Sequence, residues 1–514
     1  MPKRLLVLLL GLCAYAGAQQ RPPAQPNPQP KLVLAIVVDQ FRYDYLTRFR
    51  ADFTGGLKRM LEQGAVFTNA HYDAAPTVTA VGHSTFLTGA MPVKSGIIGN
   101  QWWDRVENKA VTSVSDDKVK LLGGNGTAAG SSPARLMVST VGDELKNSGK
   151  GGKVIGMSLK DRSAILPGGK KADAAYWFDG QSGNFVSSTY YFPELPSWVR
   201  DFNATRPADQ YAGQDWLGHQ MPATVGQELY SSVDATPFGD EMLQALALRA
   251  LAAENLGAGS KTDLLAISYS SVDYVGHRDG PDSPEIHDMV KRVDKLIGAL
   301  IDAAEARAGR GNVLVAFTAD HGATPLPEET RKRGLPAGRI VWNNYRIDVE
   351  QALNKKFGKG DWISFSLDGV LYFNPDPIRG KKLDMAKVQQ VAADTIRAES
   401  YIARVYTKTQ LAAGIPGNDP VDVRVRNGFY AARAPDIFTV TQPNYIFNAT
   451  GTTHGSPYDY DTHVPIIFLG PARIRAGSYA DSVGVEDIAP TLADLLGIPA
   501  PSGNMGHVLA QILK

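Results

Sequence analysis

Short apolar runs recur along the chain and are separated by longer stretches in which polar and apolar positions mix. Continuous apolar runs of about four to eight residues are typical of strands buried on both faces, as in a parallel sheet. The sequence therefore predicts strands at residues 32–38, 154–159, 264–267, 313–317 and 465–469.

Between these runs the pattern becomes helical. Ser283 followed by Pro284 favours a helix start, because serine caps a helix and proline fits its first turn. The apolar residues that follow form a stripe along one helix face: Ile286, Met289, Val290, Val293, Leu296, Ile297 and Leu300. Residues 241–256 are rich in Ala and Leu, and a helix at residues 485–496 ends before Gly497.

Strands that alternate with helices predict an α/β fold, here a three-layer sandwich with a mostly parallel central sheet. Ligands of such folds bind beyond the carboxyl ends of the strands. Residues from about 332 to 438 are less regular and interrupt the alternation. We interpret them as an inserted cap region.

The composition excludes several classes of protein. Of the 514 residues, 43% are hydrophobic and 20% are charged, which is too apolar for a disordered chain and sufficient for a large core. The formal net charge is +1, whereas nucleic-acid-binding proteins carry a basic surplus for the phosphates. We therefore expect no nucleic-acid partner.

The first residues indicate export. Lys3 and Arg4 precede an apolar run that is too short to span a bilayer stably, and small residues follow it. We expect a signal peptide over residues 1–18, a proline-rich linker over 19–30, and a periplasmic or secreted mature domain over 31–514 with no membrane span. A retained membrane anchor is the alternative.

Cysteine usage limits the chemistry further. Cys13 is the one cysteine of the chain and lies within the expected signal peptide. The mature chain can then form no disulfide, and it offers no thiolate to a metal.

Polar residues follow two of the predicted strands. Asp39 comes directly after the strand at 32–38, and Asp320 and His321 come after the strand at 313–317. Adjacent side chains on a strand face opposite ways, so Asp320 and His321 converge only if the chain leaves strand geometry there, which Gly322 permits. Taken singly, each residue is also explained as a cap or a turn former.

A second group lies later in the chain. Asp273 and His277 are four residues apart, which on a helix places them one turn apart on one face. His454 lies between Gly451 and Gly455, where packing gives little reason for a histidine. With the residues above, these form two possible divalent-metal sites. Carboxylate and imidazole ligands without thiolate suit zinc best, with manganese and other divalent ions as alternatives.

Two more segments could contact an anion. Thr77 and Thr79 precede a helix-like stretch, and a helix start binds anions through its free N–H groups. A neighbouring divalent cation can hold a threonine as an alkoxide, whereas the alternative role is a simple N-cap. Lys160 and Arg162 share a face if their segment is extended, and could then bind one anion. A solvated charge cluster is the commoner role for such residues.

In this order, the motifs resemble those of the alkaline phosphatase superfamily, and more narrowly of its type I phosphodiesterase/nucleotide pyrophosphatase branch. Within that branch the chain is most similar to the bacterial phosphate-irrepressible, PafA-type alkaline phosphatases. The resemblance covers nearly the whole expected mature chain. The motifs are Asp39, Pro76-Thr77-Val78-Thr79 with Gly82-His83, Asp273 with Gly276-His277, Ala319-Asp320-His321-Gly322, Thr453-His454-Gly455, and Val485-Glu486-Asp487-Ile488-Ala489-Pro490-Thr491-Leu492.

The resemblance implies two zinc ions per chain and a role for each motif. One zinc would be bound by Asp273, His277 and His454, and the other by Asp39, Asp320 and His321. Thr79 would lie beside the second zinc, as its ligand and as the nucleophile. Asn100 matches a position whose amide donates to a phosphoryl oxygen. Lys160 and Arg162 match a pair that binds the charged oxygens of a monoester.

The resemblance therefore implies an exported zinc-dependent alkaline phosphatase that hydrolyses small-molecule phosphate monoesters through a phosphothreonine on Thr79. The alternative is a phosphodiesterase or nucleotide pyrophosphatase with the same metals and nucleophile, although diesterases of the branch lack the Lys–Arg pair. A sulfatase is a further alternative, because Ser131-Ser132-Pro133-Ala134-Arg135 fits Ser-x-Pro-x-Arg. We interpret that segment as a helix start. A non-catalytic metal-dependent binding protein is the last alternative, and the oligomeric state stays open, a monomer included.

Overall fold

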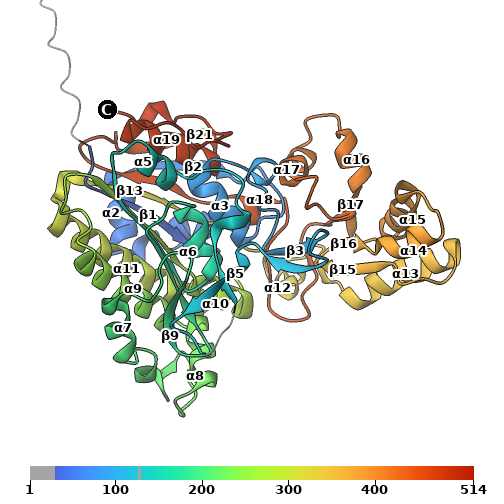
Figure 1. Ribbon diagram of the computed structural model, residues 1–514, viewed down its shortest axis with the longest axis horizontal. Helices are drawn as coiled ribbons and strands as arrows, with labels where there is room; N and C mark the ends of the chain where they lie inside the picture. The colour runs from blue at the N-terminus through green and yellow to red at the C-terminus, as the bar shows by residue number, and fades with distance from the viewer. Residues whose placement is uncertain (1–28, 126–128) are drawn as a thin grey trace, which may run out of the picture.

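An eleven-stranded sheet forms the centre of the molecule in the computed structural model, which describes residues 29–125 and 129–514 (Figure 1). The expected signal peptide and most of the linker lie outside these residues. The strands lie in the spatial order β21 (Gly477–Gly484), β2 (Ala65–His71), β20 (Ile466–Leu469), β13 (Val313–Thr318), β1 (Leu32–Val38), β12 (Thr262–Tyr269), β7 (Gly151–Ser158), β8 (Ala174–Asp179), β9 (Asn184–Ser188), β5 (Ser115–Leu122) and β6 (Ala129–Ser131).

The middle of the sheet is parallel. β1 pairs in parallel with β12 on one side and with β13 on the other, and β7 and β8 continue the parallel order. Every residue of β1 is buried, which accounts for its unbroken apolar run. The predicted α/β fold with a mostly parallel central sheet is confirmed.

One predicted strand has an unexpected direction. β20, expected at residues 465–469 as part of a parallel sheet, is antiparallel to both of its neighbours, β2 and β13. The expectation was wrong for this strand because an apolar run indicates burial on both faces and carries no information about direction.

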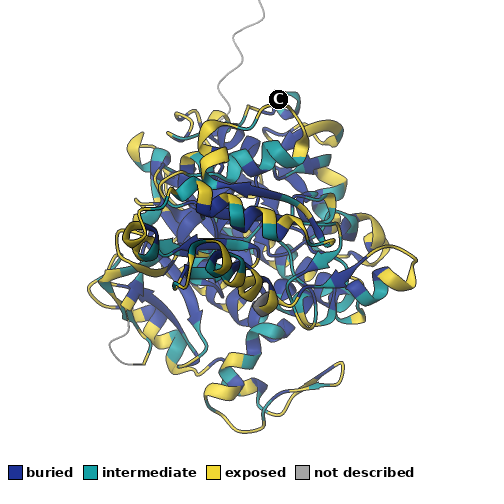
Figure 2. Ribbon diagram, turned by 90° about the vertical axis from the view of Figure 1, so that its right-hand side faces the viewer, coloured by how far each residue is buried: buried dark blue, intermediate teal, exposed yellow. Residues whose placement is uncertain are grey.

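Helices cover both faces of this sheet (Figure 1). The predicted start of α11 is confirmed, since the Ser283 hydroxyl accepts a hydrogen bond of 3.2 Å from the Ile286 N–H. Figure 2 shows buried strands inside and exposed surfaces on the outer helices. One layer contains α2 (Gly56–Gln63), α9 (Pro237–Ala253) and α11 (Pro284–Ala308), and the other contains α3 (Thr79–Thr88), α5 (Val141–Asn147), α6 (Asp161–Gly168) and α19 (Ile488–Leu496).

A second, four-stranded antiparallel sheet interrupts the chain between β13 and β20 (Figure 1). It has a hydrophobic cluster of its own, which includes Val349, Leu353, Trp362 and Ile396. We call this unit the insertion. Its main elements are α13 (Trp342–Phe357), β15 (Ile363–Leu367), β16 (Val370–Phe373), α14 (Pro375–Gly380), α15 (Met385–Arg397), β17 (Ile402–Thr407), α16 (Lys408–Ala413), α17 (Pro420–Gly428) and β18 (Ile437–Thr441).

Shorter elements connect these units. Within residues 29–125 and 129–514, no helix combines the length and apolarity that a bilayer crossing requires. The shorter elements are α1 (Asp44–Arg48), α4 (Pro92–Ser95), β3 (Gln101–Asp104), β4 (Lys109–Thr112), α7 (Ser197–Ala204), β10 (Asp215–Trp216), β11 (His219–Gln220), α8 (Gln227–Ser232), α10 (Ser271–Asp279), α12 (Pro327–Lys332), β14 (Gly338–Arg339), β19 (Tyr445–Ile446) and α18 (Asp459–Thr462).

Candidate metal centre and nucleophile

Asp39, Asp320 and His321 lie together at the carboxyl ends of the adjacent parallel strands β1 and β13, and we call them the buried cluster. His321 Nε2 is 3.5 Å from Asp39 Oδ1 and 3.4 Å from Asp320 Oδ2, and all three side chains are 0% exposed. The chain leaves strand geometry after Thr318, as the sequence predicts. Gly322 is required there, because a Cβ on it would lie 2.2 Å from the Tyr460 carbonyl oxygen.

The donor atoms of the buried cluster suit a divalent cation. Asp39 Oδ1, Asp320 Oδ2 and His321 Nε2 are buried and have no hydrogen-bond partner among the described residues. The Nδ1–H of His321 donates to the Gly322 carbonyl at 2.9 Å, which leaves the Nε2 lone pair for a ligand. Burial lowers the pKa of His321 to about 3, so its imidazole is neutral, as metal ligation requires. Burial and then Asp39 raise the pKa of Asp320 well above its usual range. Converging lone pairs of this kind are costly without a cation.

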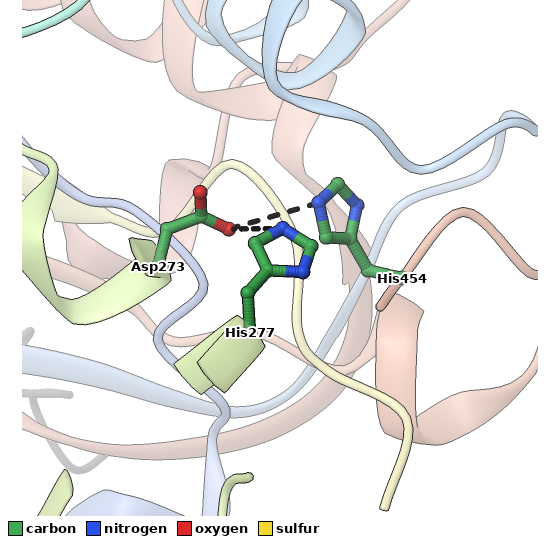
Figure 3. A group of neighbouring side chains, drawn as sticks. All are labelled: Asp273, His277 and His454. Atoms are coloured by element: carbon green, nitrogen blue, oxygen red, sulfur yellow. Dashed lines mark ion pairs between the residues drawn. The ribbon is translucent and has the colours of Figure 1, made fainter. Parts of the chain in front are cut away.

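Asp273, His277 and His454 form the second group, which we call the open cluster (Figure 3). As predicted, Asp273 and His277 lie one turn apart on a helix, α10. Their side chains approach within 3.2 Å, and His454 Nε2 lies 3.7 Å from the same Asp273 oxygen. The Nδ1–H groups of His277 and His454 donate to the carbonyls of Thr452 and Thr77, each at 2.8 Å. Main-chain carbonyls therefore orient Nε2 of both rings toward Asp273.

The open cluster is charged differently from the buried one. Burial opposes protonation of His277, but the adjacent Asp273 carboxylate outweighs it and raises the pKa of His277 to about 9. Burial, followed by the neighbouring His321 and His277, holds the pKa of His454 well below its usual value. The His277 side chain is 32% exposed, so this cluster reaches solvent.

The two clusters are contiguous. The rings of His321 and His454 stack with their centroids 3.4 Å apart. Lys160 Nζ lies 2.7 Å from Asp39 Oδ2 and 2.5 Å from Asp273 Oδ2, so one ammonium group contacts a carboxylate of each cluster. Burial disfavours the charge on Lys160, but Asp273 and Asp39 outweigh it and raise the Lys160 pKa. The six predicted metal ligands thus lie in two adjoining clusters at one place in the fold.

Thr79 is the first residue of α3 and is buried beside this centre. Its carbonyl accepts a hydrogen bond of 2.9 Å from His83 Nδ1, and burial lowers the pKa of His83 to about 4, so that ring is neutral. Gly82 brings the helix against the buried cluster, because a Cβ there would lie 2.1 Å from the Asp320 carbonyl oxygen. His454 binds the Thr77 carbonyl, two residues before Thr79. The start of α3 is therefore held against both clusters.

Asn100 also lies beside the start of α3. Its Oδ1 accepts a hydrogen bond of 2.8 Å from the Ala80 N–H, which leaves the amide NH₂ to donate to a ligand. The residue is partly exposed and lines a cavity that His454 also lines.

Lys160 and Arg162 differ from the expected geometry. The expectation of an extended segment was wrong, since Lys160 is the N-cap of α6 and Arg162 lies in its first turn. The acidic Asp161 at the first helical position favours this helix start. Arg162 Nε is buried without a hydrogen-bond partner among the described residues, so the guanidinium has donor capacity left for an anion.

The sulfatase-like segment has the expected capping geometry. Pro133–Arg135 forms a single turn of 3₁₀-helix, and the Ser132 hydroxyl accepts a hydrogen bond of 3.2 Å from the Ala134 N–H. The interpretation of this segment as a helix start is confirmed.

A third metal-capable group escaped the sequence reasoning. His219, Asp279 and Glu285 come together from β11 and the adjoining ends of α10 and α11, with His219 Nε2 3.3 Å from Glu285. Arg278 already pairs with Asp279 at 2.7 Å. No motif marks these residues in the sequence, because the β10–β11 hairpin that carries His219 was not predicted.

Comparison with known proteins places this arrangement in a family. The sequence profile described as "Type I phosphodiesterase / nucleotide pyrophosphatase" matches residues 33–463. The chain belongs to this family. The resemblance noted from the motifs is thus confirmed, and so is the expectation of an enzyme of the phosphoric ester hydrolase class.

Relatives that match this chain over its full length include proteins named as alkaline phosphatases. Alkaline phosphatase PhoV from Synechococcus elongatus is 35% identical, with 100% of both chains covered. Alkaline phosphatase PafA from Elizabethkingia meningoseptica is 33% identical, over 100% of this chain and 99% of PafA. A crystal structure of wild-type PafA superposes with a TM-score of 0.87 at 32% identity, covering 95% of this chain and 99% of that one.

Proposed function

We propose that this chain is an exported, zinc-dependent alkaline phosphatase that hydrolyses phosphate monoesters through a covalent intermediate on Thr79. The observation that carries the proposal is the convergence of six metal-ligand side chains, in two contiguous clusters, on the first turn of the helix that begins with Thr79. The full-length similarity to alkaline phosphatases supports the choice of reaction.

The two clusters would each hold one zinc ion, with Asp39, Asp320, His321 and Thr79 around one and Asp273, His277 and His454 around the other. Two cations bound there would supply Lewis-acid stabilisation of the attacking and departing oxygens. The neutral imidazoles of His321 and His454 and the buried partnerless oxygens fit this role.

The protein's own residues would carry the substrate through two displacements. Thr79 Oγ gives up its proton and bonds to phosphorus while the bond from phosphorus to the ester oxygen breaks, and the alcohol leaves after gaining a proton. Water then attacks the phosphothreonine, Thr79 regains its proton and inorganic phosphate departs. Asn100, Lys160 and Arg162 would donate to the equatorial oxygens, where charge accumulates in the transition state.

A phosphodiesterase or nucleotide pyrophosphatase activity on the same residues is the second candidate. The description of the family profile favours it. The presence of both Lys160 and Arg162 at one helix start favours monoesters instead, because two cations match the extra charged oxygens of a monoester. Export rests on the expected signal peptide at residues 1–18, which lie outside the described residues.

Covalent trapping tests the proposal. Purified protein would be mixed with a monoester labelled in its phosphate, quenched in acid and digested, so that the labelled peptide identifies the nucleophile. We expect label on residue 79 in the wild type and in Thr79→Ser, and none in Thr79→Ala, whose turnover falls by about 10³-fold or more. Label retained by folded Thr79→Ala would refute the assignment of the nucleophile.

A further inference from the structure

A cavity opens beside the open cluster, between the central sheet and the insertion. Asn100, His454 and Gly455 line it on the side of the proposed reaction. The opposite wall comes from the insertion and from the segment just after it, through Leu367, Val370, Phe438 and Phe447. A group attached to a phosphoryl centre at Thr79 therefore has this cavity as its neighbour.

The insertion gives this wall an apolar surface. Leu367, Val370, Phe438 and Phe447 are each only partly buried, so their side chains keep surface that a ligand could cover. A ligand that covers this apolar surface removes it from water, which favours binding of an apolar group.

Hydrogen bonds to main-chain carbonyls hold this wall in place. The Thr439 N–H donates to the Gly369 carbonyl at 3.0 Å, which ties β18 to the β15–β16 turn. The Tyr372 hydroxyl donates to the Arg433 carbonyl at 3.0 Å. Beyond β19, Arg339 donates to the carbonyls of Asn448 and Gly451 at 2.9 and 2.8 Å. The shape of the wall is thus set before a ligand arrives.

The charge of the lining is one-sided. Among the described residues that line the cavity there is no Lys or Arg, and Asp368 is the one carboxylate. Asp368 and Gly369 form the two-residue turn between β15 and β16, with φ of 37° and 86°, the left-handed backbone that an Asp-Gly hairpin turn adopts. A second anionic group on a substrate would meet this carboxylate, and no Lys or Arg of the lining offsets it.

We propose that this cavity is the leaving-group subsite, selecting monoesters of apolar, uncharged or cationic alcohols and rejecting leaving groups with further negative charge. The inference rests on the proposed function, because the cavity acts on the group that departs from phosphorus. Leu367 and Phe447 supply apolar contact, and Asp368 repels anions. Esters whose leaving group is a nucleoside diphosphate or a sugar phosphate are therefore expected to be poor substrates.

The apolar part is tested with two alkyl monoesters whose leaving alcohols have similar acidity, methyl phosphate and cyclohexylmethyl phosphate. We expect kcat/KM for the larger ester to exceed that for methyl phosphate by roughly tenfold in the wild type. In the Leu367→Ala/Phe447→Ala double variant, the ratio should fall about threefold or more, while a far-UV circular dichroism spectrum like that of the wild type reports folding. Ile347→Ala, on an exposed face of α13, is the matched control and should leave the ratio unchanged.

The charge part is tested with phosphoethanolamine and phosphoglycolate, which differ in the sign of the charge on a small leaving group. In Asp368→Asn, the preference for phosphoethanolamine should fall by about threefold to tenfold. Asparagine also adopts the left-handed backbone at position 368, so the turn is retained.

The outcomes separate this inference from the proposed function. The subsite proposal would be wrong if the wild type hydrolysed methyl phosphate but had no higher kcat/KM for cyclohexylmethyl phosphate. It would also be wrong if none of the three substitutions changed the kcat/KM ratios. Neither result would contradict the phosphatase proposal. Absence of turnover of every monoester by the zinc-loaded wild type would overturn both.

Discussion

The buried and open clusters combine carboxylates and imidazoles in different proportions and in different surroundings. Side chains of the buried cluster are 0% exposed and follow rigid parallel strands, whereas His277 of the open cluster is 32% exposed and sits on a short helix. Partnerless donor atoms occur in the buried cluster at Asp39, Asp320 and His321. In the open cluster, an ion pair of Asp273 with His277 already balances part of the charge.

This contrast separates two tasks of the proposed two-metal site. A cluster that cannot be satisfied by water depends on its cation and is suited to hold a nucleophile in a fixed place. A cluster that reaches solvent and a cavity can accept different leaving groups and admit water. The start of α3 adjoins the buried cluster, and the cavity beside His454 adjoins the open cluster.

The largest expected effects on turnover come from replacing one candidate ligand in each cluster. Asp320→Asn keeps the shape but removes a buried charge, so we expect turnover to fall by about 10³-fold or more without recovery in excess zinc. His277→Ala should lose about 10²-fold at limiting zinc and recover largely at saturating zinc, because water can enter as the missing ligand.

Metal content and turnover of an aryl monophosphate, both measured against free zinc, check this prediction. Equal recovery of the two variants would show that burial does not distinguish the clusters. Asp279→Asn, in the third metal-capable group, is a matched control and should change neither quantity.

Lys160 contacts both clusters, so its replacement tests their joint role through the choice of substrate. Replacing Lys160 and Arg162 together by Ala should lower kcat/KM for an aryl monophosphate by about 10²-fold or more and change that for a diester by only about threefold, since a diester lacks the extra charge. Lys170→Ala, just beyond the other end of α6, is the control. Similar losses on both esters would rule out a role in selecting monoesters.

Glu486 provides a reference for a buried carboxyl that belongs to neither cluster. Burial, and then Asp73, raise the pKa of Glu486 to about 8, and its Oε2 has no hydrogen-bond partner among the described residues. In the unfolded chain its pKa is near 4.5, so the unfolded state loses the proton first as pH rises. Stability should therefore decrease between about pH 4.5 and 8, and the loss is complete above pH 8.

Glu486→Gln removes this ionisation, so it should raise the free energy of unfolding by up to roughly 5 kcal/mol at pH 9 and by nearly nothing at pH 4.5. Denaturant unfolding of both proteins at the two pH values measures it. A gain that is equal at both would mean that Glu486 is not held in its neutral form.

Much of the centre could be predicted because its residues lie at the ends of apolar runs. The run before Asp39 is β1 itself, and the four-residue spacing of Asp273 and His277 matches one turn of α10. His454 was predicted as a ligand because it lies in a loop flanked by glycines. These signals are local, so a single sequence contains them.

The remaining features depend on long-range contacts. The direction of β20, the contact of Lys160 with two carboxylates and the tie from His454 to Thr77 join segments far apart in the chain. The helical start at Lys160 was missed because a charged triplet after a strand fits an extended end as well as a cap. The cavity wall at Leu367 and Asp368 was not predicted because its partners come from separate elements.

The insertion lies in the sequence between His321 and His454, so the ligand set is completed only by residues made after the whole insertion. The ribosome must therefore synthesise an entire second sheet before the last imidazole becomes available. An insertion that folds within its own hydrophobic cluster would bring the two flanking segments back together, and would lower the entropy cost of joining the last imidazole to the other candidate ligands.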